Sequence, residues 1–412
     1  MPSDPVSATP LGATPLGATP LGATPLGAMP LGAMPLGAMP LGAMPLRIDS
    51  AELRLVRLPL ITPFTIATGT MVEKVFPLLT LRADGIAGYA EGVMDPTPDY
   101  LEETITGGMG MLREVILPLV VGKAFENPAA LERVLTPWRG HQMAKAVVEM
   151  AFWDLWAKSL NLPLKTLLGG SGDRVAVGVS LGIGPIEDTV DRVAAHLAQG
   201  YQRIKLKIRP GHDVALVAAV RARFPDCHLT VDANSCYTLA DTGLLRQLDA
   251  FALDYIEQPL AWDDIHDHAT LQQRIATPIC LDECIRGVAD ARKALQTDAA
   301  RVINIKVGRS GGYLESLRIH DLCAAFGVPV WCGGMLESGI GRAHNIHLST
   351  LPNFTRPGDT SSASRYFTRD LIQEKLETNA GWMPVPDGPG IGVHPDWDFV
   401  QTMTRSVETM SA

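Results

Sequence analysis

The stretch RIKLKIRPG, residues 203 to 211, carries two lysines two positions apart in a run that otherwise has the apolar character of a buried strand. Because side chains alternate across a β-strand, Lys205 and Lys207 share one face of it. Lysine is depleted in strands and is almost never buried without a partner. The fold must therefore bring polar or negatively charged groups against this face, and we ask which part of the chain supplies them.

Seven strand-like segments follow one another from Val175 onward, separated by helix-like segments, at intervals of about 25 residues. They are VAVGVSLG, RIKLKI, HLTVDAN, DYIEQP, PICLDE, VINIKV and PVWCGG. Alternation of strand and helix predicts a parallel sheet with right-handed crossovers. With RPGDTSS as an irregular eighth strand, the count favours a TIM-type barrel. A doubly wound sheet is disfavoured, because SLGIGP lacks the third glycine of a phosphate-binding turn.

The chain before these segments is organised differently, which predicts a separate domain. RIDSAELRLVRLPL and VFPLLTLRADG resemble strands, and MAKAVVEMAFWDLWAKSL has the apolar spacing of a helix. Strands followed by helices indicate an α+β domain over residues 47–170. We assign the barrel to residues 171–370 and a C-terminal segment to residues 371–412. Between the two strands, TPFTIATGTM shows no clear period, and we interpret it as a mobile loop.

The first 46 residues form a low-complexity repeat with a period of five, in which ATPLG is followed by AMPLG. A proline in every repeat forbids a helix, so we expect disorder or a loose polyproline-like chain. One interpretation is a tether or adhesive tail. The one we favour is a translated nucleotide repeat upstream of the true start, for which Met29, Met34, Met39 and Met44 are candidates. A secretory signal is not expected, because prolines interrupt the apolar run.

Composition excludes several classes of function. The chain of 412 residues is 46% apolar and 19% charged, as is typical of a soluble globular protein. Its formal net charge of −9 argues against nucleic-acid binding, and no uncharged apolar run reaches the length of a transmembrane helix. The six cysteines include no CxxC pair, so we expect reduced thiols in a cytoplasmic protein rather than a cysteine metal site.

Charged residues stand at the ends of five successive predicted strands, where a TIM-type barrel places its active site. In chain order they are Lys205 and Lys207, Asp232, Glu257, Asp282 and Lys306. The three acids are 25 residues apart each time, so we expect them at equal height on adjacent strands. Three convergent carboxylates cannot all stay ionised in a dry site without a cation. Ligands that are all oxygen favour Mg²⁺ or possibly Mn²⁺, so a divalent metal site is predicted.

The lysines predict proton transfer at a carbon next to a carboxylate. The second and sixth strands lie opposite each other in a ring of eight, so Lys207 and Lys306 should face each other across the mouth. The α-carbon of a metal-bound carboxylate substrate would lie between them, and the metal would stabilise the enediolate. A lysine base requires a lowered pKa, and we expect Lys205 to contribute to this as a second ammonium close to Lys207.

The segments KLK, VDAN, IEQP, LDE and NIKVGRSGG resemble the enolase superfamily in its muconate lactonizing subgroup. The resemblance runs from about Arg47 to the end and leaves out the repeats. It implies an α/β fold with a modified (β/α)7β barrel of TIM type. It also implies an α+β capping domain, formed by the N-terminal region together with the C-terminal segment. TPFTIATGTM would be the lid over the site.

WCGGMLESGIGRAHN and PGDTSSASRYF resemble more closely the o-succinylbenzoate synthases that also racemise N-acylamino acids. This implies a Mg²⁺-dependent racemase of N-acyl or N-succinyl amino acids that works by 1,1-proton transfer. The alternative is o-succinylbenzoate synthase, a syn dehydration in the menaquinone route, and the same residues can serve both reactions. A catalytically silent barrel used for binding is disfavoured because the catalytic positions are intact. The expected partner is a small carboxylate substrate, and a homo-oligomer is implied.

The resemblance also implies roles for individual residues. Lys207 and Lys306 would be the acid and base, and Lys205 would tune Lys207 and contact the substrate carboxylate. The magnesium ligands would be Asp232, Glu257 and Asp282. The substrate pocket would be formed by Ser180, Asn234, Arg309, Gly333, Gly334 and Met335, with Arg309 acting from behind the first layer. Dipeptide epimerases hold a substrate ammonium with an Asp-x-Asp, and here the second acid is replaced by Ser361.

Overall fold

The computed structural model describes residues 45–67 and 69–412, and the fold of this part follows. The repeat predicted to be disordered falls, up to Met44, outside the described residues. Leu46 and Arg47 already form a short strand, β1 (Leu46–Arg47), which pairs with β5 (Ala124–Phe125).

Seven parallel strands form the predicted sheet of the barrel, and each neighbours the next in the chain. They are β7 (Val179–Leu181), β8 (Ile204–Lys207), β9 (Leu229–Asp232), β10 (Ile256–Glu257), β11 (Ile279–Leu281), β12 (Val302–Ile305) and β13 (Val330–Cys332). RPGDTSS closes the ring as the irregular eighth member, since Gly358 forms a parallel bridge with Val177 and the Asp359 amide donates to the Cys332 carbonyl. The predicted modified barrel is confirmed.

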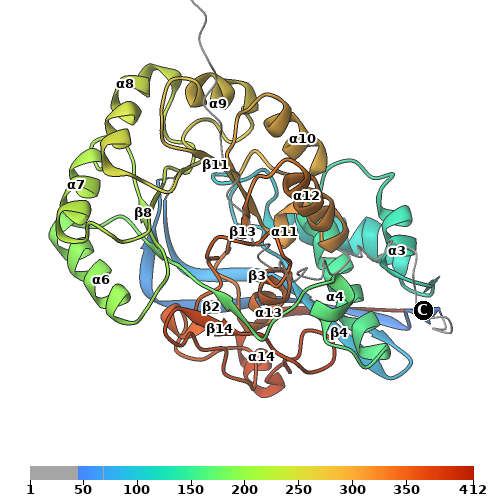
Figure 1. The fold of residues 1–412 in the computed structure, drawn as a ribbon. Helices are drawn as coiled ribbons and strands as arrows, with labels where there is room; N and C mark the ends of the chain where they lie inside the picture. Colours follow the sequence, from blue (N-terminus) through green and yellow to red (C-terminus); the bar gives the residue numbers. More distant parts are fainter. Residues whose placement is uncertain (1–44, 68) are drawn as a thin grey trace, which may run out of the picture. The chain divides into compact units, whose positions relative to one another are not determined.

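Helices lie outside these strands, and Figure 1 shows α6, α7, α8, α9, α10 and α12 as an arc around β8, β11 and β13. Their bounds are α6 (Ile186–Ala198), α7 (Val214–Arg223), α8 (Thr242–Leu245), α9 (Ile265–Gln272), α10 (Val288–Gln296), α11 (Val307–Ser310), α12 (Tyr313–Ala325) and α13 (Gly339–Leu348). Short 3₁₀ segments η2 (Leu239–Asp241), η3 (Arg246–Phe251) and η4 (Ala363–Arg365) complete this region. Both faces of the sheet are buried, as its near-continuous apolar strands require.

The capping domain is an antiparallel sheet with helices packed on it. Its strands are β2 (Ser50–Thr65), β3 (Thr70–Ala83), β4 (Ile86–Glu91) and, from the C-terminal segment, β15 (Thr404–Ser411), which pairs with β2. The helices are α1 (Ile105–Met111), η1 (Leu112–Ile116), α2 (Leu117–Val120), α3 (Pro128–Leu135), α4 (Gln142–Ser159) and α5 (Leu164–Leu168). The C-terminal part also contributes α14 (Trp397–Met403) and β14 (Trp382–Pro384), which pairs with β6 (Arg174–Ala176).

TPFTIATGTM was expected to be a loop without secondary structure, and its described residues are mostly strand. β2 continues to Thr65 and β3 begins at Thr70, with Phe64 in register with Met71 and Thr65 with Thr70. The pairing extends the long hairpin of the cap. The segment is therefore held as strand by its cross-strand partners and not by an alternating pattern in its own sequence. The Ile183 amide donates to the Thr65 carbonyl at 3.1 Å, so the end of the hairpin contacts the loop after β7.

The lower part of the barrel is closed by apolar side chains from neighbouring strands. Trp331, Tyr255, Cys280 and Val302 form one buried cluster, with the Trp331 and Tyr255 rings stacked at 6.0 Å between centroids. Replacing so large a buried side chain as Trp331 with alanine typically costs about 3–5 kcal/mol of stability. The cluster forms the floor of the barrel beneath Lys205, whose Nζ lies 4.7 Å from the centre of the Trp331 ring.

None of the helices in the described ranges combines the length and apolar character needed to cross a membrane. All six cysteines are free thiols.

Candidate active site

RIKLKI forms β8, and its lysines lie in register with acids on the neighbouring strands. Lys207 pairs with Asp232 on β9, and Asp232 pairs with Glu257 on β10, so the three side chains form one row on the same face of the sheet. Asp282 departs from the predicted equal height. Glu257 is in register with Cys280, which leaves Asp282 two residues farther along. Strands of a barrel are staggered, so equal sequence spacing does not give equal height.

Within residues 45–67 and 69–412, the side chains that contact the Lys207 ammonium belong to the barrel. Lys207 Nζ donates to Asp232 Oδ2 at 2.6 Å and to Asn234 Oδ1 at 2.6 Å. Asn234 Nδ2 donates in turn to Glu283 Oε1 at 3.1 Å. The φ of Asn234 is 42°, a left-handed conformation that asparagine adopts more readily than most residues. Glu283 therefore fixes the side chain of Asn234, whose oxygen accepts from Lys207.

Lys205 lies one layer deeper, in register with Ser180 and Thr230. Its Nζ contacts Glu257 Oε2 at 2.8 Å and Asp232 Oδ2 at 3.3 Å. A third carboxylate, Asp359 Oδ2, lies 2.8 Å away. Asp232 is thus shared between both lysines of the opening stretch, which answers what these two cations face.

Lys306 directly follows β12, which is four strands away from β8, with β9, β10 and β11 between them. Its Nζ donates to Asp282 Oδ2 at 2.8 Å and to the Tyr100 hydroxyl at 2.7 Å, and Met335 Sδ lies at 3.5 Å. The Tyr100 hydroxyl also donates to Asp282 Oδ2 at 3.0 Å. A Cβ at position 333 would lie 2.6 Å from Lys306 Cε, so Gly333 leaves the room that this side chain needs.

Arg309 is buried behind Asp282. Its guanidinium contacts Asp282 Oδ1 through Nη1 and donates to the backbone carbonyls of Asn304 at 2.8 Å and Ile285 at 3.0 Å. Asp282 is therefore held from two sides, by Lys306 and by Arg309. Arg309 does not reach the wall of the cavity described next, and neither does Gly333.

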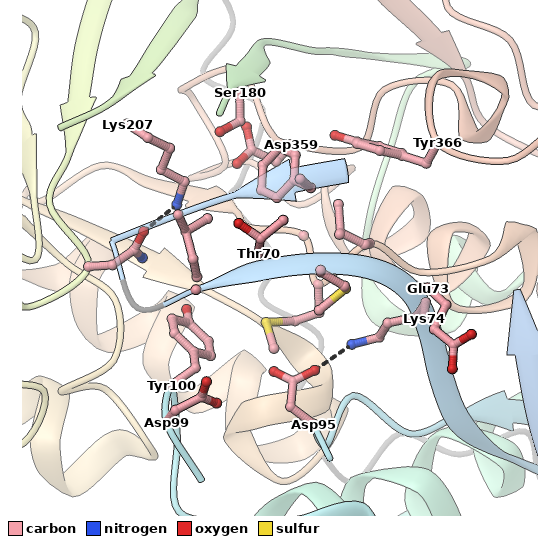
Figure 2. A pocket seen from close by; sticks show the side chains of 18 of the residues that line it. Thr70, Glu73, Lys74, Asp95, Asp99, Tyr100, Ser180, Lys207, Asp359 and Tyr366 are labelled. Atoms are coloured by element: carbon pink, nitrogen blue, oxygen red, sulfur yellow. Dashed lines mark hydrogen bonds and ion pairs between the residues drawn. The ribbon is translucent and has the colours of Figure 1, made fainter. Parts of the chain in front are cut away.

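A cavity of about 330 Å³ lies over these residues, between the barrel and the hairpin of the cap. Figure 2 shows Lys207, Ser180 and Asp359 at one end of the view and Tyr100, Asp95 and Lys74 at the other. Of the predicted site residues, those that line it are Ser180, Lys205, Lys207, Asp232, Asn234, Lys306, Gly334 and Met335. Glu257 and Asp282 are buried beneath its wall. Phe64, Ile66 and Met71 of the predicted lid, together with Val72 directly after it, line its apolar side.

Two family models match the chain. The N-terminal domain of mandelate racemase and muconate lactonizing enzyme matches residues 50–169, and the enolase C-terminal domain-like model matches residues 188–399. The chain belongs to the enolase superfamily. The resemblance inferred from the strand-end motifs is thereby confirmed.

Individual relatives within the enolase superfamily are similar over nearly their whole length. The N-succinylamino acid racemase of Thermus thermophilus is 54% identical over 367 residues, which are 89% of this chain and 100% of the relative. The o-succinylbenzoate synthase of Geobacillus kaustophilus is 49% identical over 87% of this chain and 96% of the relative. A crystal structure of an enolase-superfamily member from Listeria innocua is 40% identical, with a TM-score of 0.86, and covers 89% of this chain and 99% of its own. The racemase and the synthase are both enzymes.

The electrostatics of the row differ from one acid to the next. Burial raises the pKa of Asp232, but the charges of Lys207 and Lys205 outweigh this and hold the pKa below its usual range. The pKa of Glu257 is raised, first by burial and then by the charge of Asp232. Burial lowers the pKa of Lys205, yet Asp359, Glu257 and Asp232 together raise it well above its usual range. Lys205 is therefore a fixed cation.

Members of the enolase superfamily use a divalent metal ion, and the acids have the right chemistry for one. Asp232, Glu257 and Asp282 offer only oxygen donors, as Mg²⁺ prefers. However, each of the three carboxylates is paired with a lysine ammonium. Within residues 45–67 and 69–412, no three His, Cys, Asp or Glu side chains lie close enough together to hold a metal ion as they stand. The three acids fit a divalent ion once the ammonium groups of the lysines turn away from their carboxylates.

Sequence reasoning missed three residues that the site uses. Arg203 lies two positions before Lys205 on the same face, so the alternation that singled out the lysines could have found it. Glu283 directly follows Asp282, and burial together with the charge of Asp232 raises its pKa to about 7. Tyr100 had no local signal, because it reaches Lys306 only through the docking of the cap on the barrel.

Proposed function

We propose that this protein is a Mg²⁺-dependent racemase of N-acyl, chiefly N-succinyl, amino acids that works by 1,1-proton transfer. The observation that carries the proposal is the pair Lys207 and Lys306. They line one cavity from strands on opposite sides of the ring, and each is oriented by its own carboxylate. Two amines on opposite faces of an α-carbon can remove a proton from one face and return one to the other.

Asp232, Glu257 and Asp282 would hold the divalent ion. When bound, the ion supplies positive charge that stabilises the negative charge developing on the substrate carboxylate. Lys205, a fixed cation in the same cavity, adds to this charge and pairs with the substrate carboxylate. With Asp232 and Asp282 engaged as ligands, Lys207 and Lys306 would no longer be held by these carboxylates, and both amines could turn toward the α-carbon.

The remaining wall of the cavity suits an acylated substrate. On the barrel side Ser180 offers a polar group, Gly334 a small one and Met335 an apolar one, and the hairpin of the cap adds Phe64 and Ile66. Two carboxylates of this wall are engaged by cations of the protein, since Asp359 pairs with Arg203 and Lys205 and Asp95 pairs with Lys74. A substrate whose nitrogen is acylated requires no free carboxylate there.

A second function, o-succinylbenzoate synthase, is favoured by the 49% identity to the Geobacillus kaustophilus enzyme of that name. In that reaction one lysine removes the α-proton and hydroxide then leaves from the same face. The same row of acids would serve both reactions. Only one of the two lysines needs to exchange a proton with the substrate in the dehydration.

The test is a comparison of rates on N-succinyl amino acids and on the hydroxylated precursor of o-succinylbenzoate, with the same enzyme preparation. In D₂O, deuterium should enter the α-position of both N-succinyl enantiomers. Chelation should remove the activity, and Mg²⁺ or Mn²⁺ should restore it. Dehydration without exchange in either N-succinyl enantiomer would favour the second function, and activity that survives exhaustive chelation would refute the metal site.

A further inference from the structure

Lys205 is surrounded by three carboxylates, two of which belong to the proposed metal set. Glu257 and Asp232 lie 2.8 Å and 3.3 Å from its Nζ, and both would turn to a divalent ion when one binds. Asp359, at 2.8 Å, is the third. Lys205 is buried, and a buried ammonium without a partner is costly. When the ion takes the first two acids, only Asp359 among these carboxylates remains to compensate its charge.

Asp359 is itself fixed from below. Arg203 Nη2 donates to Asp359 Oδ1 at 2.8 Å and to the Pro357 carbonyl at 2.8 Å. The Arg203 guanidinium lies 5.1 Å from the centre of the Trp331 ring, which holds it in the floor of the barrel. A Cβ at position 178 would lie 2.6 Å from the Arg203 guanidinium carbon, so Gly178 makes room for it. Arg203 thus pairs with Oδ1 of Asp359, and this orients Oδ2 of the same carboxylate toward Lys205.

We infer that Asp359, clamped by Arg203, is a positioning residue that retains Lys205 when the divalent ion takes Glu257 and Asp232. The inference rests on the proposed function, because it requires that an ion bind at these acids. Asp359 acts on the ion only through Lys205. It keeps the Lys205 ammonium in an ion pair, so that binding of the divalent ion does not leave a buried charge without a partner. Figure 2 shows Asp359 among the residues around the cavity, and its side chain is only 13% exposed.

The experiment is a double-mutant cycle on metal affinity. Mn²⁺ binding is measured by isothermal titration calorimetry on the full chain as wild type, Asp359→Asn, Lys205→Met and the double variant. We expect Asp359→Asn to weaken Mn²⁺ binding at least about tenfold, because Lys205 then stays on Glu257 and Asp232 and competes with the ion. In the Lys205→Met background the same substitution should cost less than about threefold, since no ammonium is left to retain.

Asp95→Asn is the matched control. Asp95 also lines the cavity and also pairs with a lysine, Lys74, at 3.0 Å, so the variant removes the same charge from another part of the same cavity. It should change Mn²⁺ affinity by less than about twofold. If Asp359→Asn does not fold, as judged by thermal unfolding, Arg203→Met takes its place, because it leaves Asp359 charged but unclamped. It should weaken binding in the same direction and lose its effect in the Lys205→Met background.

The outcomes separate this inference from the proposed function. Equal losses with and without Lys205 would mean that Asp359 acts on the ion directly or on the fold, and they overturn the inference. So would an Asp359→Asn variant with wild-type affinity, while a wild type that binds Mn²⁺ and racemises keeps the proposed function standing. A wild-type chain that binds no Mn²⁺ overturns both.

Discussion

The two lysines on opposite sides of the cavity are held in different ways. Lys207 is oriented by Asp232 and Asn234, which belong to β9 and the loop after it. Lys306 is oriented by Asp282 of the barrel and by the Tyr100 hydroxyl of the capping domain. One side is complete within the barrel, and the other is completed only when the cap is in place.

The close approach of the cap on the Lys306 side is built into the sequence. A Cβ at position 308 would lie 2.9 Å from both methyl groups of Val93, so Gly308 lets the cap pack directly against the turn after Lys306. Tyr100 comes from the same part of the cap. The comparison suggests that the barrel alone prepares one proton-transfer group, and that closing the cap prepares the other.

The largest expected effect comes from removing either lysine. Lys207→Ala and Lys306→Ala should each lower racemisation by at least about 10³-fold, because general acid–base catalysis typically contributes 10²–10⁴-fold and the reaction needs both groups. Each variant should still exchange the α-proton of one N-succinyl enantiomer with D₂O and lose exchange of the other. NMR of the α-proton of each enantiomer measures this directly.

Lys74→Met is a control for loss of a lysine from the cavity. Lys74 lines the same cavity, and the only described hydrogen bond of its side chain is to Asp95. It should retain exchange of both enantiomers. The two-lysine interpretation fails if either Lys207→Ala or Lys306→Ala exchanges both enantiomers at near wild-type rates.

Much of the barrel side could be predicted from the sequence, because barrel strands follow one another in space as they do in the chain. The period of about 25 residues placed Lys207, Asp232 and Glu257 on adjacent strands, and the register of β8, β9 and β10 agrees. The stagger that moves Asp282 two residues beyond its neighbours could not be predicted, since it depends on how the ring closes. The roles of these residues in metal binding remain predictions.

The cap side could not be predicted, for a physical reason. Tyr100 lies in the irregular segment before α1 and is 206 residues away from Lys306 in the chain. Only the packing of two separately formed layers brings them together, and no local pattern encodes that contact. The hairpin at residues 62–71 was misjudged for a related reason, because its strand character comes from its partner strand.

The next largest effect is expected from Tyr100, the residue of the cap that helps to orient Lys306. Tyr100→Phe removes a hydroxyl that accepts from Lys306 at 2.7 Å and donates to Asp282 at 3.0 Å. Hydrogen bonds to charged groups are worth about 1.5–3 kcal/mol, so proton transfer through Lys306 should slow roughly tenfold or more. Transfer through Lys207 should change much less. The ratio of exchange rates for the two enantiomers reports this difference without depending on protein concentration.

Tyr366→Phe is the matched control for the second prediction. Tyr366 lines the same cavity, but its hydroxyl has Arg365 Nη1 as its described partner, at 3.3 Å, and contacts neither lysine. The exchange ratio should stay at the wild-type value. An equal slowing of both enantiomers by Tyr100→Phe would mean that the cap supports both sides alike, and the contrast between the two lysines would be lost.

The smallest expected effect concerns the attachment of the cap to the barrel near Lys306. Glu91, at the end of β4, accepts from the backbone amides of Ser338 at 3.0 Å and Gly341 at 3.1 Å at the start of α13. Burial is the main reason that its pKa is raised to about 8, with Glu337 adding to the shift and Ser338 opposing it. The loop before α13 carries Met335, which contacts Lys306.

A carboxyl whose pKa is raised on folding stabilises the fold fully below its unfolded pKa and loses that contribution as the pH rises through the folded value. Glu91 should therefore make the wild type less stable as the pH rises from about 5 to 8, by roughly 1–3 kcal/mol. Glu91→Gln cannot ionise and should flatten this slope in urea unfolding at pH 5, 6.5 and 8. Some slope should remain, because burial also raises the pKa of Glu149 to about 7. Glu52→Gln, a change on β2 of the same sheet, should keep the wild-type slope. A Glu91→Gln variant as pH-sensitive as the wild type would show that the attachment of the cap does not depend on this proton.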